Sequence, residues 1–138
     1  MSILRRTLLA FAALAALPAL ADPLAPGCWV GAVKKSDGKT TDYTVQLWLA
    51  GDPGRPSGKL HLGNPRSCAV VASYKDDTAF SLSRPTGGVC LSTLSDKVLV
   101  LTAGADGFAF AIDGLTVPAQ DALKLYAKAA TEESCLMQ

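Results

Sequence analysis

The sequence is poor in the side chains that exchange protons in enzyme active sites. His61 is its only histidine, and its only glutamates, Glu132 and Glu133, come near the end of the chain. There is no Gly-x-Ser-x-Gly nucleophile motif and no glycine-rich phosphate loop before a helix. His61 alternates with Leu60 and Leu62 in a short apolar segment, so we expect it to face solvent. These absences predict that the protein is not an enzyme. A hydrolase, which would need His61 beside an aspartate in a cleft, is kept as the second alternative to the binding functions given at the end of this section.

Metal-ligand spacing and an excess of basic charge are absent as well. The four cysteines include no Cys-x-x-Cys pair, and one histidine is too few for the usual zinc sites. The chain has 13 Lys and Arg against 12 Asp and Glu, whereas nucleic-acid-binding domains concentrate basic residues. We therefore expect no metal, no other cofactor and no nucleic-acid partner.

The longest apolar run lies at the N-terminus, where residues 1–21 have the three parts of a secretory signal peptide. Arg5 and Arg6 form a positive start, and residues 8–17 are an apolar stretch too short for a stable membrane anchor. Ala19-Leu20-Ala21 then places small residues at the −3 and −1 positions. We predict cleavage after Ala21, a periplasmic or secreted product, and no stable membrane insertion.

The mature chain, residues 22–138, is expected to be a single domain stapled by disulfides. Removing the two arginines of the signal leaves 11 basic residues against 12 acidic ones, a net charge of −1. All four cysteines remain, and an even number in an oxidising compartment indicates two disulfides with three alternative pairings. The cysteines are Cys28, Cys68, Cys90 and Cys135.

Short apolar segments recur about every ten residues along the mature chain, separated by turn residues. Tight connections of this kind favour antiparallel pairing of consecutive strands. We expect a mainly β fold of about eight short antiparallel strands, arranged as a small barrel or a two-sheet sandwich. The predicted strands are 28–34, 42–50, 59–63, 68–74, 78–84, 89–94, 97–103 and 108–112.

The C-terminal segment changes to helical periodicity. Apolar residues recur at spacings of three and four after Pro118, which suits the first turn of a helix. We predict one amphipathic C-terminal α-helix packed outside the sheet, against residues 98–101, which are apolar on both faces of their strand. The residues of the predicted helical stripe are Ala119, Ala122, Leu123, Tyr126, Ala129 and Ala130.

Alternating strand directions bear on the disulfide pairing. Cys68 and Cys90 begin the predicted fourth and sixth strands at one end of the sheet, Cys28 begins the first strand at the other end, and Cys135 follows the helix. We therefore favour Cys68–Cys90 with Cys28–Cys135. The fourth and sixth strands are not neighbours, and two strand spacings of about 4.8 Å exceed disulfide reach, so the first pair requires a curled sheet or a bulged fifth strand.

Candidate binding residues lie in one loop and on one strand. Residues 51–58 form a loop that begins and ends in glycine and contains Pro53 and Pro56, with Arg55 near its apex. An ordered loop can insert into a cleft of another protein at low entropic cost, and a plain surface loop is the alternative. Trp48 faces away from the apolar stripe of its strand. It is either covered by other elements or exposed as an anchor for a partner.

Gly27-Cys28-Trp29 at the start of the first strand resembles the Gly-x-Trp that opens lipocalin-type (calycin) barrels. Eight short strands followed by a C-terminal helix are similar to the outline of that family. The resemblance implies that Trp29 is structural and plugs the closed end of a barrel. The family's arginine that packs on this tryptophan has no counterpart in or just after residues 108–112.

Two functions follow as expectations. The first is a non-enzymatic protein-binding module of the cell envelope, inhibitor- or immunity-like, whose partner is an envelope or secreted protein. The second is a calycin-like carrier of a small apolar ligand. A cavity open at one end favours the carrier, whereas a filled interior with exposed Arg55 or Trp48 favours the protein binder. The residues expected to line the cavity, or equally to fill a core, are Tyr43, Val45, Leu47, Phe80, Leu82, Phe108 and Phe110.

Overall fold

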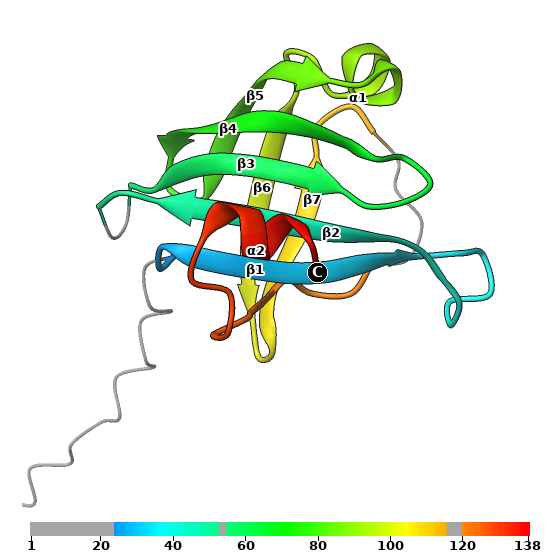
Figure 1. Cartoon of the computed structure of the whole chain (residues 1–138), viewed down its shortest axis with the longest axis horizontal. Coiled ribbons are helices and arrows are strands. Elements are labelled where there is room, and N and C mark those ends of the chain that lie inside the picture. Colours follow the sequence, from blue (N-terminus) through cyan, green and yellow to red (C-terminus); the bar gives the residue numbers. More distant parts are fainter. Residues whose placement is uncertain (1–23, 53–54, 116–119) are drawn as a thin grey trace, which may run out of the picture.

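The computed structural model describes residues 24–52, 55–115 and 120–138, so the predicted signal peptide and its cleavage site lie outside the described residues. Within these ranges the chain forms eight strands and two short helices (Figure 1). The strands are β1 (Gly27–Lys34), β2 (Thr41–Ala50), β3 (Ser57–Leu62), β4 (Cys68–Asp76), β5 (Ala79–Thr86), β6 (Val98–Gly104), β7 (Gly107–Ile112) and β8 (Lys124–Leu125); the helices are α1 (Gly88–Thr93) and α2 (Glu132–Leu136).

The eight described strands form one antiparallel sheet that curls into a nearly closed barrel. Each of β1 to β6 pairs with the next strand in the chain, and β8 pairs with β1. On the other side, the backbone of Leu123 exchanges hydrogen bonds of 2.9 and 2.7 Å with the backbone of Phe108 in β7. The segment around Leu123 therefore joins the two edges of the sheet. The fold class expected from the sequence is confirmed, and of its two forms the structure has the barrel.

The prediction of a sixth strand at residues 89–94 is wrong: residues 89–93 belong to helix α1, and Leu94 caps its C-terminal end. The chain turns at Gly87, whose φ of 91° lies in the region that favours glycine. Cys90 is then buried against the barrel while Leu91 is 63% exposed. Periodicity alone does not separate a strand from a helix in an apolar run this short.

The predicted helix after Pro118 is wrong over most of its length, although a short C-terminal helix is present. Pro118 and Ala119 lie outside the described residues, and Gln120 to Leu125 are extended and paired with β1 and β7. Helix α2 begins only after Thr131, whose side chain accepts a hydrogen bond from the Ser134 backbone N–H as an N-cap. Pairing with two sheet edges outweighs the helical spacing of the apolar residues.

We expected the C-terminal helix to pack on residues 98–101, which lie in β6. Helix α2 lies instead across the outer faces of β1 and β2 (Figure 1). Val100 on the outer face of β6 is consequently 39% exposed. The disulfide between Cys28 of β1 and Cys135 of α2, with a Cα–Cα distance of 5.4 Å, fixes the helix in its observed place.

Both favoured disulfides are present. The Cys68–Cys90 bond does not have to span two strand spacings, as the predicted strand order required. Cys68 at the start of β4 bonds to Cys90, with a Cα–Cα distance of 5.9 Å. Cys90 lies on α1, which follows β5 directly, and Thr86 at the end of β5 pairs with Ala69 next to Cys68. The bridge therefore joins β4 to the helix that follows its neighbour β5, and it does not cross a strand.

Inward-facing side chains fill most of the barrel. Trp29 is buried at one end, where its ring meets Phe108 edge-on with centroids 5.2 Å apart. Its indole N–H donates to the carbonyl of Ala25 at 3.0 Å, so the polar atom of the ring is satisfied. All seven residues expected to line a cavity or fill a core belong to this interior, Tyr43 partly buried and the others buried. Among the largest fully buried side chains are Leu47, Leu49, Leu60, Phe80, Leu82 and Leu99.

The two disulfides should contribute unequally to stability. Replacing Cys28 and Cys135 by alanine should lower the free energy of unfolding by about 5 kcal/mol, and replacing Cys68 and Cys90 by about 3 kcal/mol. The reason is loop closure in the unfolded chain, since the pairs are separated by 107 and 22 residues. Urea unfolding of the oxidised protein and both double variants measures the difference. A larger loss for the Cys68–Cys90 pair would contradict the loop-closure argument.

Barrel closure should depend on the absence of a side chain at Gly107. A Cβ there would collide with the backbone carbonyl of Leu123, and the φ of Gly107 is +132°. Gly51 is a matched control, because its φ is +104° but a Cβ would meet nothing within 4 Å. We expect Gly107→Ala to lower the free energy of unfolding by about 2–4 kcal/mol more than Gly51→Ala. Equal losses in urea titrations would show that backbone conformation, not closure, is at stake.

Candidate functional site

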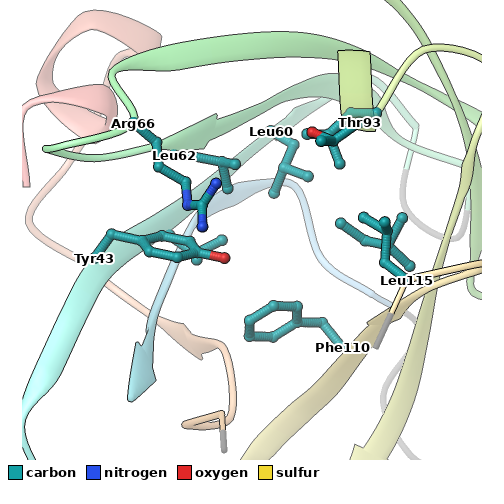
Figure 2. A pocket seen from close by; sticks show the side chains of 10 residues that line it. Tyr43, Leu60, Leu62, Arg66, Thr93, Phe110 and Leu115 are labelled. Carbon is teal, nitrogen blue, oxygen red and sulfur yellow. The ribbon is translucent and has the colours of Figure 1, made fainter. Parts of the chain in front are cut away.

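A cavity of about 180 Å³ lies at the end of the barrel away from Trp29. Strand β7 runs from Phe108, beside Trp29, to Ile112, which lines the cavity. Figure 2 shows side chains from several elements converging on this space. The lining residues are Tyr43, Val45, Leu60, Leu62, Arg66, Thr93, Leu94, Phe110, Ile112 and Leu115.

The walls of the cavity are apolar because they continue the inward faces of the strands. Val45 in β2, Leu60 in β3 and Phe110 in β7 are each buried and alternate with outward-facing neighbours. Helix α1 adds Thr93 and Leu94 at its C-terminal end. The Cys68–Cys90 disulfide ties this helix to β4, so the side of the cavity that α1 forms is tethered to the barrel.

Arg66 and Tyr43 form the polar part of the rim. Arg66, on the connection between β3 and β4, is exposed, and its guanidinium carbon lies 4.8 Å from the centre of the Tyr43 ring. Figure 2 shows the Tyr43 hydroxyl directed toward the cavity, with the guanidinium beside the ring. The Thr93 hydroxyl already donates to the Val89 carbonyl at 2.6 Å. Arg66 and Tyr43 therefore supply the hydrogen-bond donors at this end of the barrel.

Tyr43 remains a neutral phenol at physiological pH. Burial raises the pKa of Tyr43 above its ordinary value of 10.0, and the negative charge of Asp42 raises it further, while the positive charge of Arg66 and a hydrogen bond with its side chain act in the opposite direction. A neutral phenol carries an O–H that can donate to an acceptor on a ligand. The rim can therefore bind an acceptor group through both residues.

The second polar cluster lies outside the barrel, where the end of the chain covers β2. Gln46 is fully buried there, and its side-chain oxygen accepts from His61 Nδ1 at 2.7 Å. Its amide nitrogen donates to Thr44 Oγ1 at 2.9 Å and to the main-chain oxygen of Gln138 at 2.6 Å. The buried amide is thus satisfied, and His61 faces outward as expected but is half-buried.

The hydrolase alternative requires His61 to contact an aspartate in a cleft. Asp42, His61 and Ser67 line one polar surface depression. His61, however, bonds to Gln46, and the Ser67 hydroxyl donates to the side chain of Asn64. In the described part of the chain no hydrogen bond joins His61 to an aspartate, and its contact with Gln46 connects it to Gln138. No group of three or more potential metal ligands occurs within the described ranges.

The candidate binding residues from the sequence are not brought together on one exposed surface. Arg55 is exposed, with its guanidinium carbon 5.9 Å from the centre of the Tyr74 ring, but Pro56 is buried and so is not available to a partner. Pro53 lies outside the described residues. Trp48 packs on the apolar cluster around the Cys28–Cys135 disulfide and is half-buried. It is therefore partly covered by other elements and partly exposed to solvent.

Arg66 was missed by the sequence analysis. The available signal was its position in the turn Asn64-Pro65-Arg66-Ser67 between two strands with inward leucine and valine residues. A turn of that kind lies at one end of a barrel, but nothing local indicates which turn borders unfilled space.

Comparison of the chain with protein-family models, with curated proteins and with solved structures gives no match. The barrel is compatible with the lipocalin-like outline that Gly27-Cys28-Trp29 suggested, and this agreement concerns the architecture alone. None of the helices in the described ranges is long and apolar enough to cross a membrane.

The contacts of His61 predict a pH effect that can be followed at a single residue. Burial lowers the pKa of His61 below its ordinary value of 6.5. The folded state then binds fewer protons than the unfolded state below that pH, so the stabilisation is fully present above about pH 6.5 and is lost as the pH falls. NMR titration of the one histidine should give a midpoint below 6.5. Urea titrations should show wild type losing more stability than His61→Gln between pH 7 and pH 5. A midpoint at or above 6.5 would contradict the observed burial.

Proposed function

We propose that the protein is an exported carrier that binds a small, largely apolar ligand in the end cavity of the barrel. The observation that supports this most is the unfilled apolar space at one end of an otherwise packed interior. Protein interiors are close-packed, with few voids larger than a water molecule, so a lined space of this size is a natural ligand site. The two disulfides are compatible with an oxidising compartment outside the cytoplasm.

The size of the cavity limits the ligand. An engineered protein cavity of about 150 Å³ holds benzene, whereas pockets for drug-sized molecules have volumes of about 300–1,000 Å³. The volume of about 180 Å³ therefore suits one six-membered ring or a short branched chain, and not the whole of a long lipid. Leu60, Leu62 and Phe110 would surround such a group with apolar surface.

A second proposal is the protein-binding module, inhibitor- or immunity-like, with an envelope or secreted partner. Exposed Arg55, placed over the Tyr74 ring, is the observation that favours it. We prefer the carrier because Pro56 is buried and Trp48 is half-covered, which leaves Arg55 as the one candidate of the four that is exposed within the described residues.

Titration with toluene tests the carrier. Binding should move the backbone NMR signals of residues that line the cavity, Leu60 and Ile112 among them, and leave those of Trp48 unchanged. Leu115→Trp places a large ring at the cavity edge, where Leu115 is only partly buried, and should weaken toluene binding by about tenfold or more.

Leu91→Trp is the matched control, since it is the same replacement on the exposed side of α1, and it should leave the affinity unchanged. Absence of cavity shifts with any small aromatic probe, or equal weakening in both variants, would reject the carrier. Capture of one envelope protein by wild type but not by Arg55→Ala would favour the second proposal instead.

A further inference from the structure

We infer that the ligand of this cavity is a small organic acid, whose apolar body lies among the leucine and phenylalanine side chains and whose carboxylate is bound at the rim by Arg66 and Tyr43. The inference rests on the proposed carrier function and names its ligand class. It follows from three features of the rim and the cavity: an arginine without an ion pair, a second donor beside it, and walls that offer no further polar partner.

Arg66 makes no ion pair in the described part of the chain, where the salt bridges are Lys34–Asp121 and Lys59–Glu132. Asp42, the acidic neighbour of Tyr43 in sequence, is close enough to affect the titration of that phenol, yet it is not within ion-pair distance of Arg66. Apart from its hydrogen bond with the Tyr43 side chain, which acts to lower the pKa of that phenol, the guanidinium has no anionic partner among the described residues, so its remaining N–H donors are available. Its planar fork of N–H groups matches the two oxygens of a carboxylate.

The aromatic ring of Tyr43 places the guanidinium at the cavity mouth. A cation held over a ring face within about 6 Å is stabilised by the ring, and here the distance is 4.8 Å. Such placement reduces the ordering cost of binding, because the arginine already lies near its working position. The Tyr43 hydroxyl is directed into the same space and adds a donor on the cavity side (Figure 2).

The rest of the cavity selects against ligands with several polar groups. Leu60, Leu62, Phe110 and Ile112 offer no hydrogen bond, and the Thr93 hydroxyl is used within α1. A second hydrogen-bond acceptor on the ligand would be buried without a donor, which should weaken binding by about fivefold to a hundredfold. The site thus fits one acidic group on an apolar body of about six to eight carbon atoms, the size expected from known cavities.

Phenylacetate and its neutral isostere phenylacetamide test the inference, with toluene as a probe of the apolar cavity alone. Wild type should bind phenylacetate about tenfold or more tightly than phenylacetamide, as expected for hydrogen bonds to a charged group. Arg66→Gln should remove this preference and retain toluene binding, and Tyr43→Phe should reduce the preference while keeping the ring under Arg66. NMR titration or calorimetry measures all affinities.

Arg55→Gln is the matched control, because Arg55 is also an exposed arginine over a tyrosine ring but does not line the cavity. It should leave the preference for phenylacetate intact. Equal affinity of wild type for the acid and the amide, with toluene still bound, would overturn the inference and leave the carrier standing. Equal loss of phenylacetate affinity in Arg66→Gln and Arg55→Gln would also overturn it, since only net charge would then matter. No binding of any of the three probes would reject the carrier itself.

Discussion

The backbone pairing of Leu123 with Phe108 is the contact on which the architecture depends. It joins β7 to the segment that also pairs with β1, so strands far apart in sequence become neighbours around a barrel. Without this pairing the sheet would have two long edges and an interior open along one side. Closure encloses the apolar faces of the strands from all directions. It also places Trp29 at one end and leaves the other end to be covered by a helix and a turn.

The cavity follows from how the two ends of the barrel are covered. At one end, Trp29 and Phe108 are large enough to fill the space. At the other, α1 and the turn carrying Arg66 cover the opening with smaller or charged side chains, and the apolar interior is incompletely filled. The same fold therefore provides a packed core for stability and a lined space for a ligand. The two are separated along the barrel axis, so variation at the rim need not disturb the core.

The sequence predicted the strands well where apolar and polar residues alternate over a whole segment. β2, with Val45, Leu47 and Leu49 buried and Trp48 outside this core, is the clearest case. Prediction from the sequence failed at residues 89–94 and after Pro118. A short apolar run at the first place and helical spacing at the second indicated the wrong element. The extended form of residues around Leu123 depends on Val33 and Phe108, which are distant in the chain. Periodicity contains no information about such partners. The apolar lining of the site was predictable for the same reason as the strands, whereas the part played by Arg66 depends on which turn borders the cavity.

The Cys68–Cys90 bond has a consequence for the rate at which a ligand would exchange. Because it anchors α1 to β4, local unfolding of the helix would still leave Cys90 tethered to β4 and would open this side of the cavity only in part. A ligand bound as proposed would instead leave past Arg66 and Tyr43, through rotation of these two side chains. Rotamer changes of exposed side chains such as Arg66 take picoseconds to nanoseconds, far faster than the opening of packed elements. Residence time would then be set by the strength of the contacts at the rim and in the cavity, and not by a backbone motion.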